Sequence, residues 1–395
     1  MRVRTLALGC GLLSGLAGPA HADWANWSVS PLSVRLENLE FRVGGDANGA
    51  VFTNDQAAFP RLDTTGATGA LRFFPSLERD YDSGLIIALK GSILAFRDRL
   101  SNDRYGGDVF EKGYLSVQTG LGTVELGDTD GAAYRLAVTG PKVDEKTSIE
   151  NPEITFFRDP LSGRAFDEVF TVRTEVGSSV NFAKLSYYSP RLFGVQLAFS
   201  YAPSEGKDVI PFVANGPHVV NRERNLWELA ANYNGNFGAL SLGAYAALAM
   251  AHNDARTFGH EGLTDWALGT ALDYSLNDDW KISLGGSYRQ TNAYAFDLNN
   301  VLSSGSTRAL HASTSATYGS WIAGFEFTDG TADGSFGAPT LGVHGYEASL
   351  AYVLNSNLQL STGWQQLRYA RSTGLFYTGP KFDADGYFLH LDFHV

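Results

Sequence analysis

Apolar and polar residues alternate with a period of two along most of this chain. In the last segment, Tyr387, Leu389 and Leu391 share one parity, whereas His390 and Asp392 share the other. The same alternation recurs near residues 85–93, 195–201, 227–233, 266–274, 282–289, 310–318 and 346–352. Strict period-two alternation predicts β-strands with one apolar face. The alternating segments number about sixteen, and fourteen or eighteen strands also agree with the pattern.

The connections between these segments differ in length. Short turns rich in Gly, Asn, Asp and Pro suit tight hairpins, and they fall at 80–83, 120–122, 190–194, 234–238, 276–279, 319–320 and 355–357. Longer polar loops lie between them, at 99–109, 203–224, 251–263, 290–307, 329–344 and 370–385. Short turns at one end and long loops at the other are typical of an outer-membrane barrel.

A soluble β-sandwich or propeller would also produce alternation, with the apolar face as its buried core. Two features favour a membrane barrel instead. Aromatic residues such as Trp227, Tyr274 and Trp321 stand at the ends of the apolar parity, as in the aromatic girdles of lipid-facing barrels. The opposite parity carries Lys, Arg, Glu, Gln and Ser, as a wet lumen would. We therefore predict an all-β, transmembrane antiparallel β-barrel.

Composition and the N-terminus agree with this class. The chain has 395 residues, of which 44 are Gly and only 18 % are charged, while 44 % hydrophobic residues exclude disorder. Arg2 and Arg4 precede an apolar run at 6–16 and a small-residue cleavage site at 20–22. This pattern predicts a signal peptide at 1–22 and the barrel at 23–395. The net charge of −12 argues against a nucleic-acid partner.

Two motifs carry a family resemblance. Residues 187–197 (YYSPRLFGVQL) and residues 123–133 (TVELGDTDGAA) resemble a strand–turn–strand segment and the entry to the long third loop of Gram-negative general porins, of the alphaproteobacterial type. The alternating C-terminal strand also resembles the family's closing strand. The family usually ends in Phe, whereas this chain ends in Val395.

The resemblance implies a sixteen-stranded homotrimeric channel for small hydrophilic solutes, in the outer membrane of a Gram-negative bacterium, narrowed by an inward-folded third loop. It also implies contact with outer-membrane lipid and recognition of the C-terminal strand by the barrel assembly machinery. Small residues on the apolar parity agree with close subunit packing, namely Ala244, Ala246, Gly286, Ala312 and Ala316.

The longest connection runs from Asp128 to Glu175 and carries ten acidic and six basic residues. A loop of this length needs a function, and folding inward would narrow the lumen. We predict an acidic constriction at Asp128, Asp130, Asp144, Glu145, Glu150 and Glu153. We predict a basic pore wall at the inward-parity residues Arg42, Arg72, Lys90, Lys184, Lys281 and Arg289. The acidic excess predicts weak cation selectivity.

No catalytic motif of the Gly-x-Ser-x-Gly or His-Glu-x-x-His type occurs, so we predict a channel and no enzyme. An outer-membrane barrel enzyme of the lipase or protease type stays open as an alternative, as does a solute-specific porin. We expect no cofactor. Asp273, Asp278 and Asp279 crowd one turn, where acidic side chains predict a structural Ca²⁺.

Overall fold

A computed structural model describes residues 29–56, 64–97, 110–150, 156–157, 172–179, 182–204, 223–253, 262–292, 295–296, 302–303, 306–332, 341–371 and 381–395. The predicted signal peptide at 1–22 lies outside the described residues. No helix in the described part of the chain has the length and apolarity of a membrane span.

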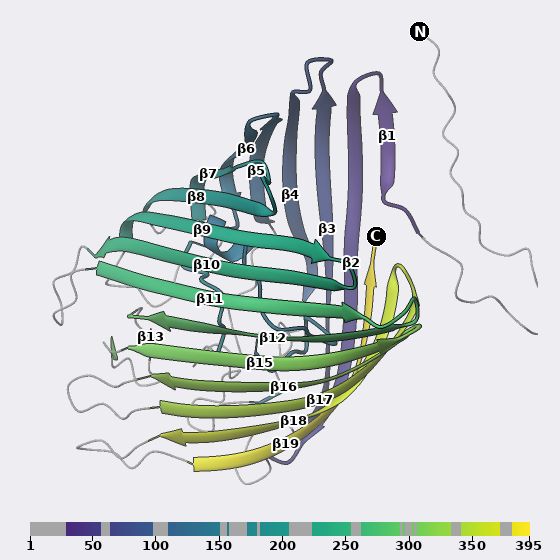
Figure 1. Cartoon of the computed structure of the whole chain (residues 1–395), viewed down its shortest axis with the longest axis vertical. Coiled ribbons are helices and arrows are strands. Elements are labelled where there is room, and N and C mark those ends of the chain that lie inside the picture. Colours follow the sequence, from purple (N-terminus) through teal and green to yellow (C-terminus); the bar gives the residue numbers. More distant parts are fainter. Residues whose placement is uncertain are drawn as a thin grey trace, which may run out of the picture.

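Seventeen strands join in one antiparallel sheet, and sixteen of them close into a ring because the last strand pairs with the second (Figure 1). The strand number predicted from alternation is therefore confirmed. The ring consists of β2 (Leu39–Asn54), β3 (Thr65–Asp80), β4 (Ile86–Arg97), β5 (Phe110–Thr119), β6 (Gly122–Thr129), β7 (Phe182–Tyr188), β8 (Val195–Ser204), β9 (Glu223–Phe237), β10 (Leu240–Asn253), β11 (Gly262–Ser275), β12 (Trp280–Thr291), β15 (Thr307–Tyr318), β16 (Trp321–Ala332), β17 (Leu341–Asn355), β18 (Leu358–Arg371) and β19 (Lys381–His394).

The two ends of the chain meet on one edge of β2. The short strand β1 (Leu32–Leu36) pairs with the first part of β2, and β19 pairs with the rest. Between them, Gly45 and Val395 exchange two backbone hydrogen bonds of 3.1 and 2.8 Å. A Cβ added to Gly44 would lie 2.8 Å from the Val395 carbonyl oxygen. Glycine at position 44 therefore lets the C-terminus approach and close the barrel.

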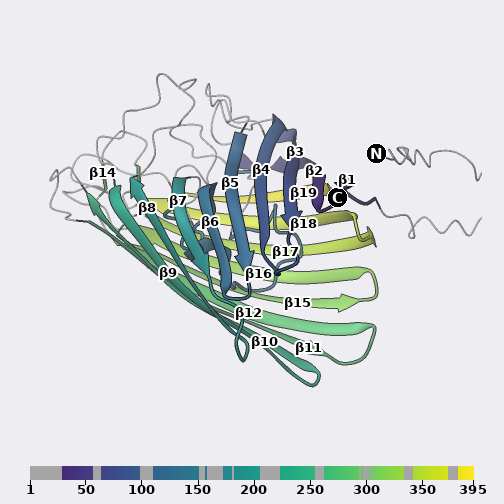
Figure 2. The same ribbon diagram turned by 90° about the horizontal axis from the view of Figure 1, so that it is seen from above.

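The connections follow the predicted asymmetry. Tight turns join the strands at one end of the barrel, and the long connections leave from the other end (Figure 2). Gly194 has φ of +85° in the turn between β7 and β8, a conformation that L side chains rarely adopt. Two further short strands, β13 (Ala295–Phe296) and β14 (Leu302–Ser303), pair with each other in the connection between β12 and β15.

The faces of the strands follow the predicted parity. On β11 the Leu268 side chain is 51 % exposed, while its neighbour Ala267 is buried. On β19 Leu389 is 46 % exposed, while His390 is buried inside. Large apolar side chains thus cover the outside of the barrel, where lipid replaces water as their surroundings.

Aromatic side chains form bands near both ends of the strands. Aromatic belts of this kind sit at the two membrane–water interfaces of a membrane protein. The ring pairs at the turn end are Trp280–Tyr318 and Trp321–Tyr352, with centroids 4.7 Å apart in each, and those at the loop end are Tyr201–Trp227 at 4.3 Å and Trp266–Tyr288 at 5.4 Å.

Replacing Leu268 with Arg should destabilise the barrel by about 2–4 kcal/mol, because a guanidinium on the lipid face loses its hydration. Asp273→Asn on the same strand keeps an acceptor for the Ser283 hydroxyl at 2.5 Å and should cost less than about 1 kcal/mol. Urea unfolding in detergent or lipid measures both. Equal losses for the two variants would contradict the assignment of faces.

Candidate pore constriction

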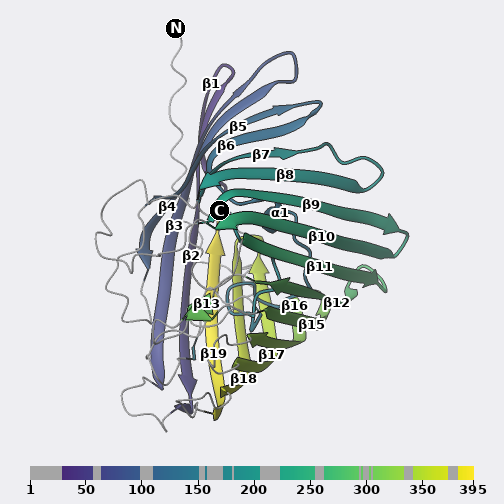
Figure 3. The same cartoon turned by 90° about the vertical axis from the view of Figure 1, so that its left-hand side faces the viewer.

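The described parts of the long connection between β6 and β7, residues 130–150, 156–157 and 172–179, lie inside the barrel. Its first turn is α1 (Ala132–Arg135), which Figure 3 shows within the curve of the sheet. The Ala133 N–H donates to the Glu228 carboxylate at 3.1 Å, and the Tyr245 hydroxyl donates to the Ala133 carbonyl at 2.6 Å. The other end of the loop returns to the same carboxylate, because the Ser179 N–H donates to Glu228 at 3.0 Å. One buried side chain on β9 thus holds both ends of the loop.

Glycines on the inner wall let the loop lie directly against the strands. A Cβ on Gly269 of β11 would lie 1.8 Å from the Val138 carbonyl oxygen. A Cβ on Gly324 of β16 would lie 2.5 Å from Val143 Cγ2. Any larger residue at these positions would push the loop toward the centre of the barrel.

The far part of the loop is tied to β18, β19 and β2. The Asp144 carboxylate lies 2.5 Å from His390 Nδ1 and accepts a hydrogen bond from the Ser361 hydroxyl. The Lys146 ammonium contacts both Asp46 and Asp392. The loop therefore crosses the inner wall from β7 as far as β2.

A buried ion-pair cluster joins the outgoing and returning arms of the loop. The Lys142 ammonium lies 2.8 Å from Glu150, 3.5 Å from Glu175 and 3.3 Å from Glu145. Burial alone would lower the pKa of Lys142, but the carboxylates of Glu150 and Glu175 raise it well above its ordinary value. Lys142 therefore stays charged and holds the two arms together.

The described part of the loop leaves a sector of the barrel open beside β2 to β5. A cavity of about 1000 Å³ fills this sector. Charged side chains dominate its lining: the basic ones are Arg42, Arg72, Lys90, Lys112, Arg135, Lys146, Arg173 and Arg289, and the acidic ones are Asp46, Glu78, Glu111, Asp130 and Glu175. Tyr114 and Tyr134 add hydroxyl groups. The cavity is therefore polar and water-accessible.

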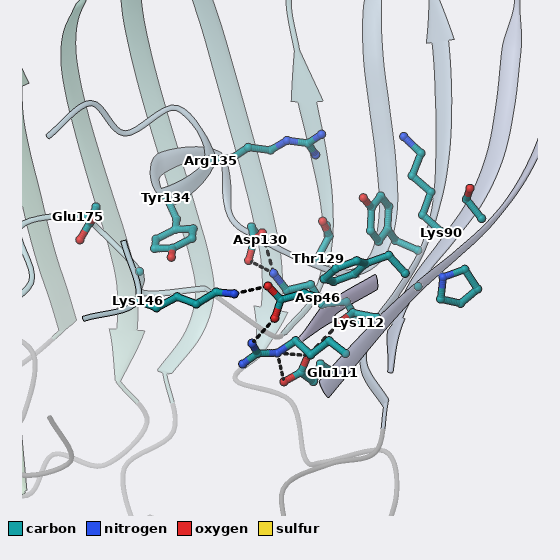
Figure 4. Close-up of a pocket in the computed structure, with 18 of the residues that line it drawn as sticks. Asp46, Lys90, Glu111, Lys112, Thr129, Asp130, Tyr134, Arg135, Lys146 and Glu175 are labelled. Carbon is teal, nitrogen blue, oxygen red and sulfur yellow. Dashed lines mark hydrogen bonds and ion pairs between the residues drawn. The ribbon is translucent and has the colours of Figure 1, made fainter. Parts of the chain in front are cut away.

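Ion pairs join the strands of the wall to one another and to the loop (Figure 4). Arg72 on β3 lies 3.2 Å from Glu111 and 3.7 Å from Asp46. Lys112 on β5 lies 2.6 Å from Asp130 at the start of the loop. Opposite charges in this arrangement hold the wall and the loop at a fixed distance, and they create a local field across the opening.

The predicted wall residues divide into two groups. Arg42, Arg72, Lys90 and Arg289 line the cavity. Lys184 is buried on β7, where its ammonium donates to the Thr129 carbonyl, and it does not line the cavity. Lys281 is exposed at the turn end of β12, also away from the cavity lining.

The predicted acidic residues are spread more widely. Asp130 lines the cavity, whereas Asp128 lies on β6 and is not part of the lining. Asp144 and Glu150 are buried in the contacts described above, and Glu145 pairs with Lys142. Glu153 lies outside the described residues, as do Asp159, Asp167 and Glu168 of the same loop.

Several lining residues were not predicted from the sequence. Lys112 shares its inward parity on β5 with Tyr114 and Ser116, so the alternation contained the signal for it. Glu111 carries no such signal, because a register shift opposite Ser92 and Ile93 brings it to the cavity beside its neighbour. The fold of the loop brings Arg135, Lys146 and Glu175 to the cavity, and strand periodicity does not encode that fold.

Within the described residues, no group of three or more His, Cys, Asp or Glu side chains has the arrangement of a metal site. His390, on the inward parity of the last strand, instead binds the loop through Asp144. Calcium at Asp273, Asp278 and Asp279 stays a prediction.

A closed antiparallel barrel with an apolar outside, a polar cavity and a loop folded inside defines a channel of the outer-membrane type. The sequence matches the family model of the Gram-negative porin over residues 7–372. The chain therefore belongs to the Gram-negative porin family and is a multi-pass β-barrel channel of the outer membrane.

Solved structures show the same fold at low sequence identity. The chain is similar to OmpF of Salmonella typhi in complex with daunomycin, with 11 % identity, a TM-score of 0.58 and coverage of 92 % of this chain and 100 % of that one. The chain is also similar to the channel DcaP of Acinetobacter baumannii, with 10 % identity, a TM-score of 0.57 and coverage of 91 % of this chain and 98 % of that one. A third similar structure is OmpT, an outer membrane protein of Vibrio cholerae, with 12 % identity, a TM-score of 0.55 and coverage of 92 % of this chain and 99 % of that one. The sequence matches no curated protein.

Acid should release the far part of the loop from the wall. Burial alone would raise the pKa of the Asp144 carboxyl, but the hydrogen bonds from His390 and Ser361 outweigh it and hold this pKa below 3.8. A lowered pKa stabilises the folded state above the ordinary pKa, and this contribution is lost as the pH falls through the folded-state value. We therefore expect a quiet open channel at about pH 6, and currents that begin to fluctuate as the pH falls through the folded-state pKa of Asp144, in single-channel recordings at stepwise lower pH.

Asp144→Asn provides the matched control, because the amide cannot ionise. This variant loses a charge-assisted hydrogen bond that contributes about 1.5–3 kcal/mol. It should fluctuate at about pH 6 as the unchanged protein does only in acid. A quiet Asp144→Asn channel at the higher pH would show that Asp144 does not hold the loop.

Proposed function

We propose that this porin forms a water-filled channel through which small hydrophilic solutes and ions diffuse passively across the outer membrane. The observation that carries the proposal is the cavity of about 1000 Å³ between the loop and strands β2 to β5, which is lined by thirteen charged side chains. A polar opening of this kind offers a path for hydrated solutes. Family membership favours the channel over the barrel enzyme that the sequence left open.

Weak cation selectivity, predicted from the acidic loop, stays a prediction. The charges on the cavity argue for a smaller preference or one of opposite sign, because eight basic and five acidic side chains line it. Two of the predicted carboxylates, Asp144 and Glu150, contact the wall or the other arm of the loop instead. Groups turned away from the opening act on a passing ion over a longer distance, and Coulomb energy falls as that distance grows.

Purified protein in a planar bilayer should conduct with a linear current–voltage relation at low voltage. In a KCl gradient, the reversal potential should report a chloride permeability equal to or above that of potassium, because cationic groups are in excess on the lining. A heat-denatured sample is the control. Absence of conductance would contradict the channel proposal, while a clear potassium preference would support the sequence-based prediction.

We also propose that the channel is a homotrimer. One similar structure, OmpT of Vibrio cholerae, is described as a trimer form. On the outside of this barrel, Ala244, Thr270, Gly286 and Ala312 stand in register across β10, β11, β12 and β15. A row of small side chains offers a flat surface on which a second copy can pack closely.

Light scattering in mild detergent should give three times the mass of the mature chain, and heating should convert this species to the monomer. Ala312→Trp should shift the mass toward the monomer, since the indole would hold the neighbouring copies apart. Leu389→Trp, at another exposed outward position on β19, is the control and should remain trimeric. A monomeric mass for the unchanged protein would refute the trimer.

A further inference from the structure

Strands β2, β3 and β4 carry a cationic row on the wall of the cavity, and β2 and β3 carry two carboxylates beside it, of which Glu78 lines the cavity. Arg42, Ser76 and Lys90 stand in register across the three strands, and all three line the cavity. Glu40 and Glu78 also stand in register, two residues closer to the turns on β2 and β3. The first row is cationic and the second row is anionic.

The separation of the two rows follows from strand geometry. Two residues along a strand span about 6.6–6.8 Å. Lys90 and Glu78 are diagonal neighbours on adjacent strands, since Ser76 faces Lys90 and Glu78 faces Ala88. Diagonal neighbours have Cα atoms about 7–8 Å apart. Their side chains therefore start from points on the wall that are about the length of a small solute apart.

Lys90 and Glu78 differ from the other charged residues of the cavity. Among the described residues, no ion pair or hydrogen bond joins either of them to a partner, and no dashed line reaches Lys90 in Figure 4. Glu78 has only a longer-range electrostatic interaction with Arg42. By contrast, Arg72 pairs with Glu111 at 3.2 Å, and Lys112 pairs with Asp130 at 2.6 Å. The remaining lining charges likewise have electrostatic partners.

An unpaired cation beside an unpaired anion presents a dipole to a passing solute. A solute with one charge finds one group attractive and the other repulsive, so the two effects largely cancel. A zwitterion that aligns its carboxylate with Lys90 and its ammonium with Glu78 finds both attractive. The Ser76 hydroxyl, in register with Lys90, is placed to donate to the same carboxylate.

We propose that Lys90 and Glu78, with Ser76, form a subsite for zwitterionic amino acids on the channel wall. The subsite rests on the proposed channel function and adds a preferred solute class to it. Arg42 and Glu40 reinforce the same dipole from β2, with their own pair at 2.6 Å. The contacts are solvent-accessible, so they speed passage of amino acids without holding them.

Liposome swelling tests the subsite with four probes: γ-aminobutyrate, succinate, putrescine and the neutral sugar arabinose. With all rates taken relative to arabinose, γ-aminobutyrate should enter faster than succinate and faster than putrescine. Lys90→Gln should lower its relative rate about twofold, the factor expected for removing one charge at ~8 Å in a water-like dielectric. Glu78→Gln should lower it similarly. The two variants should also favour putrescine and succinate, respectively, by about fourfold, because each of these solutes carries two charges of one sign.

The charge-swapped double variant Lys90→Glu/Glu78→Lys reverses the local dipole, which the unchanged Arg42–Glu40 pair then opposes, and should restore only part of the rate of γ-aminobutyrate. Lys281→Gln, outside the cavity lining, is the control and should leave all ratios unchanged. If Lys90 and Glu78 only pair with each other, the single variants will leave the γ-aminobutyrate ratio unchanged and the subsite is overturned. If arabinose itself fails to enter, the channel function fails instead, so the two failures are distinguishable.

Discussion

Backbone N–H and C=O groups in the hydrocarbon layer have no water to bond, so each must find a partner within the protein. The sixteen strands meet this constraint by closing on themselves, with Gly45 and Val395 sealing the junction between the two ends of the chain. Closure then fixes the parity of every strand. Apolar residues such as Leu268 face outward, and the polar residues that alternate with them therefore face the lumen. The polar interior is therefore a consequence of the closed ring.

A wet lumen does not by itself place a loop, and the inner wall does so in two ways. Glycines such as Gly269 and Gly324 remove side chains along the path, so the loop backbone lies against the strands. Carboxylates such as Glu228 accept the N–H groups that an irregular segment leaves without partners. The wall thus supplies both room and hydrogen-bond acceptors along one side of the barrel. The sector beside β2 to β5 stays open as the cavity.

The sequence predicts those features that depend on period two. Alternation identified the strand number, the outward face at Leu268 and the inward basic residues Arg72 and Lys90, because a strand leaves no freedom in which side a residue faces. The irregular loop has no such period. Asp144 and Glu150 look like pore carboxylates in the sequence, yet the fold turns them toward His390 and Lys142. Glu111 reaches the cavity because of a register shift, which the alternation of apolar and polar residues does not predict.

The sign of a pore's preference depends on which charges face the opening. This chain has a net charge of −12, but the cavity has more basic than acidic side chains. The two facts agree because many carboxylates, such as Glu125 and Asp265, stand behind the cations that they pair with, Arg135 and Arg289. A solute in the opening is closer to the cationic end of each such pair and feels a weak positive potential. Where the pairing is incomplete, at Lys90 and Glu78, the wall instead presents separate charges of both signs. Selectivity then follows from the distribution of charge within the solute as well as from its total.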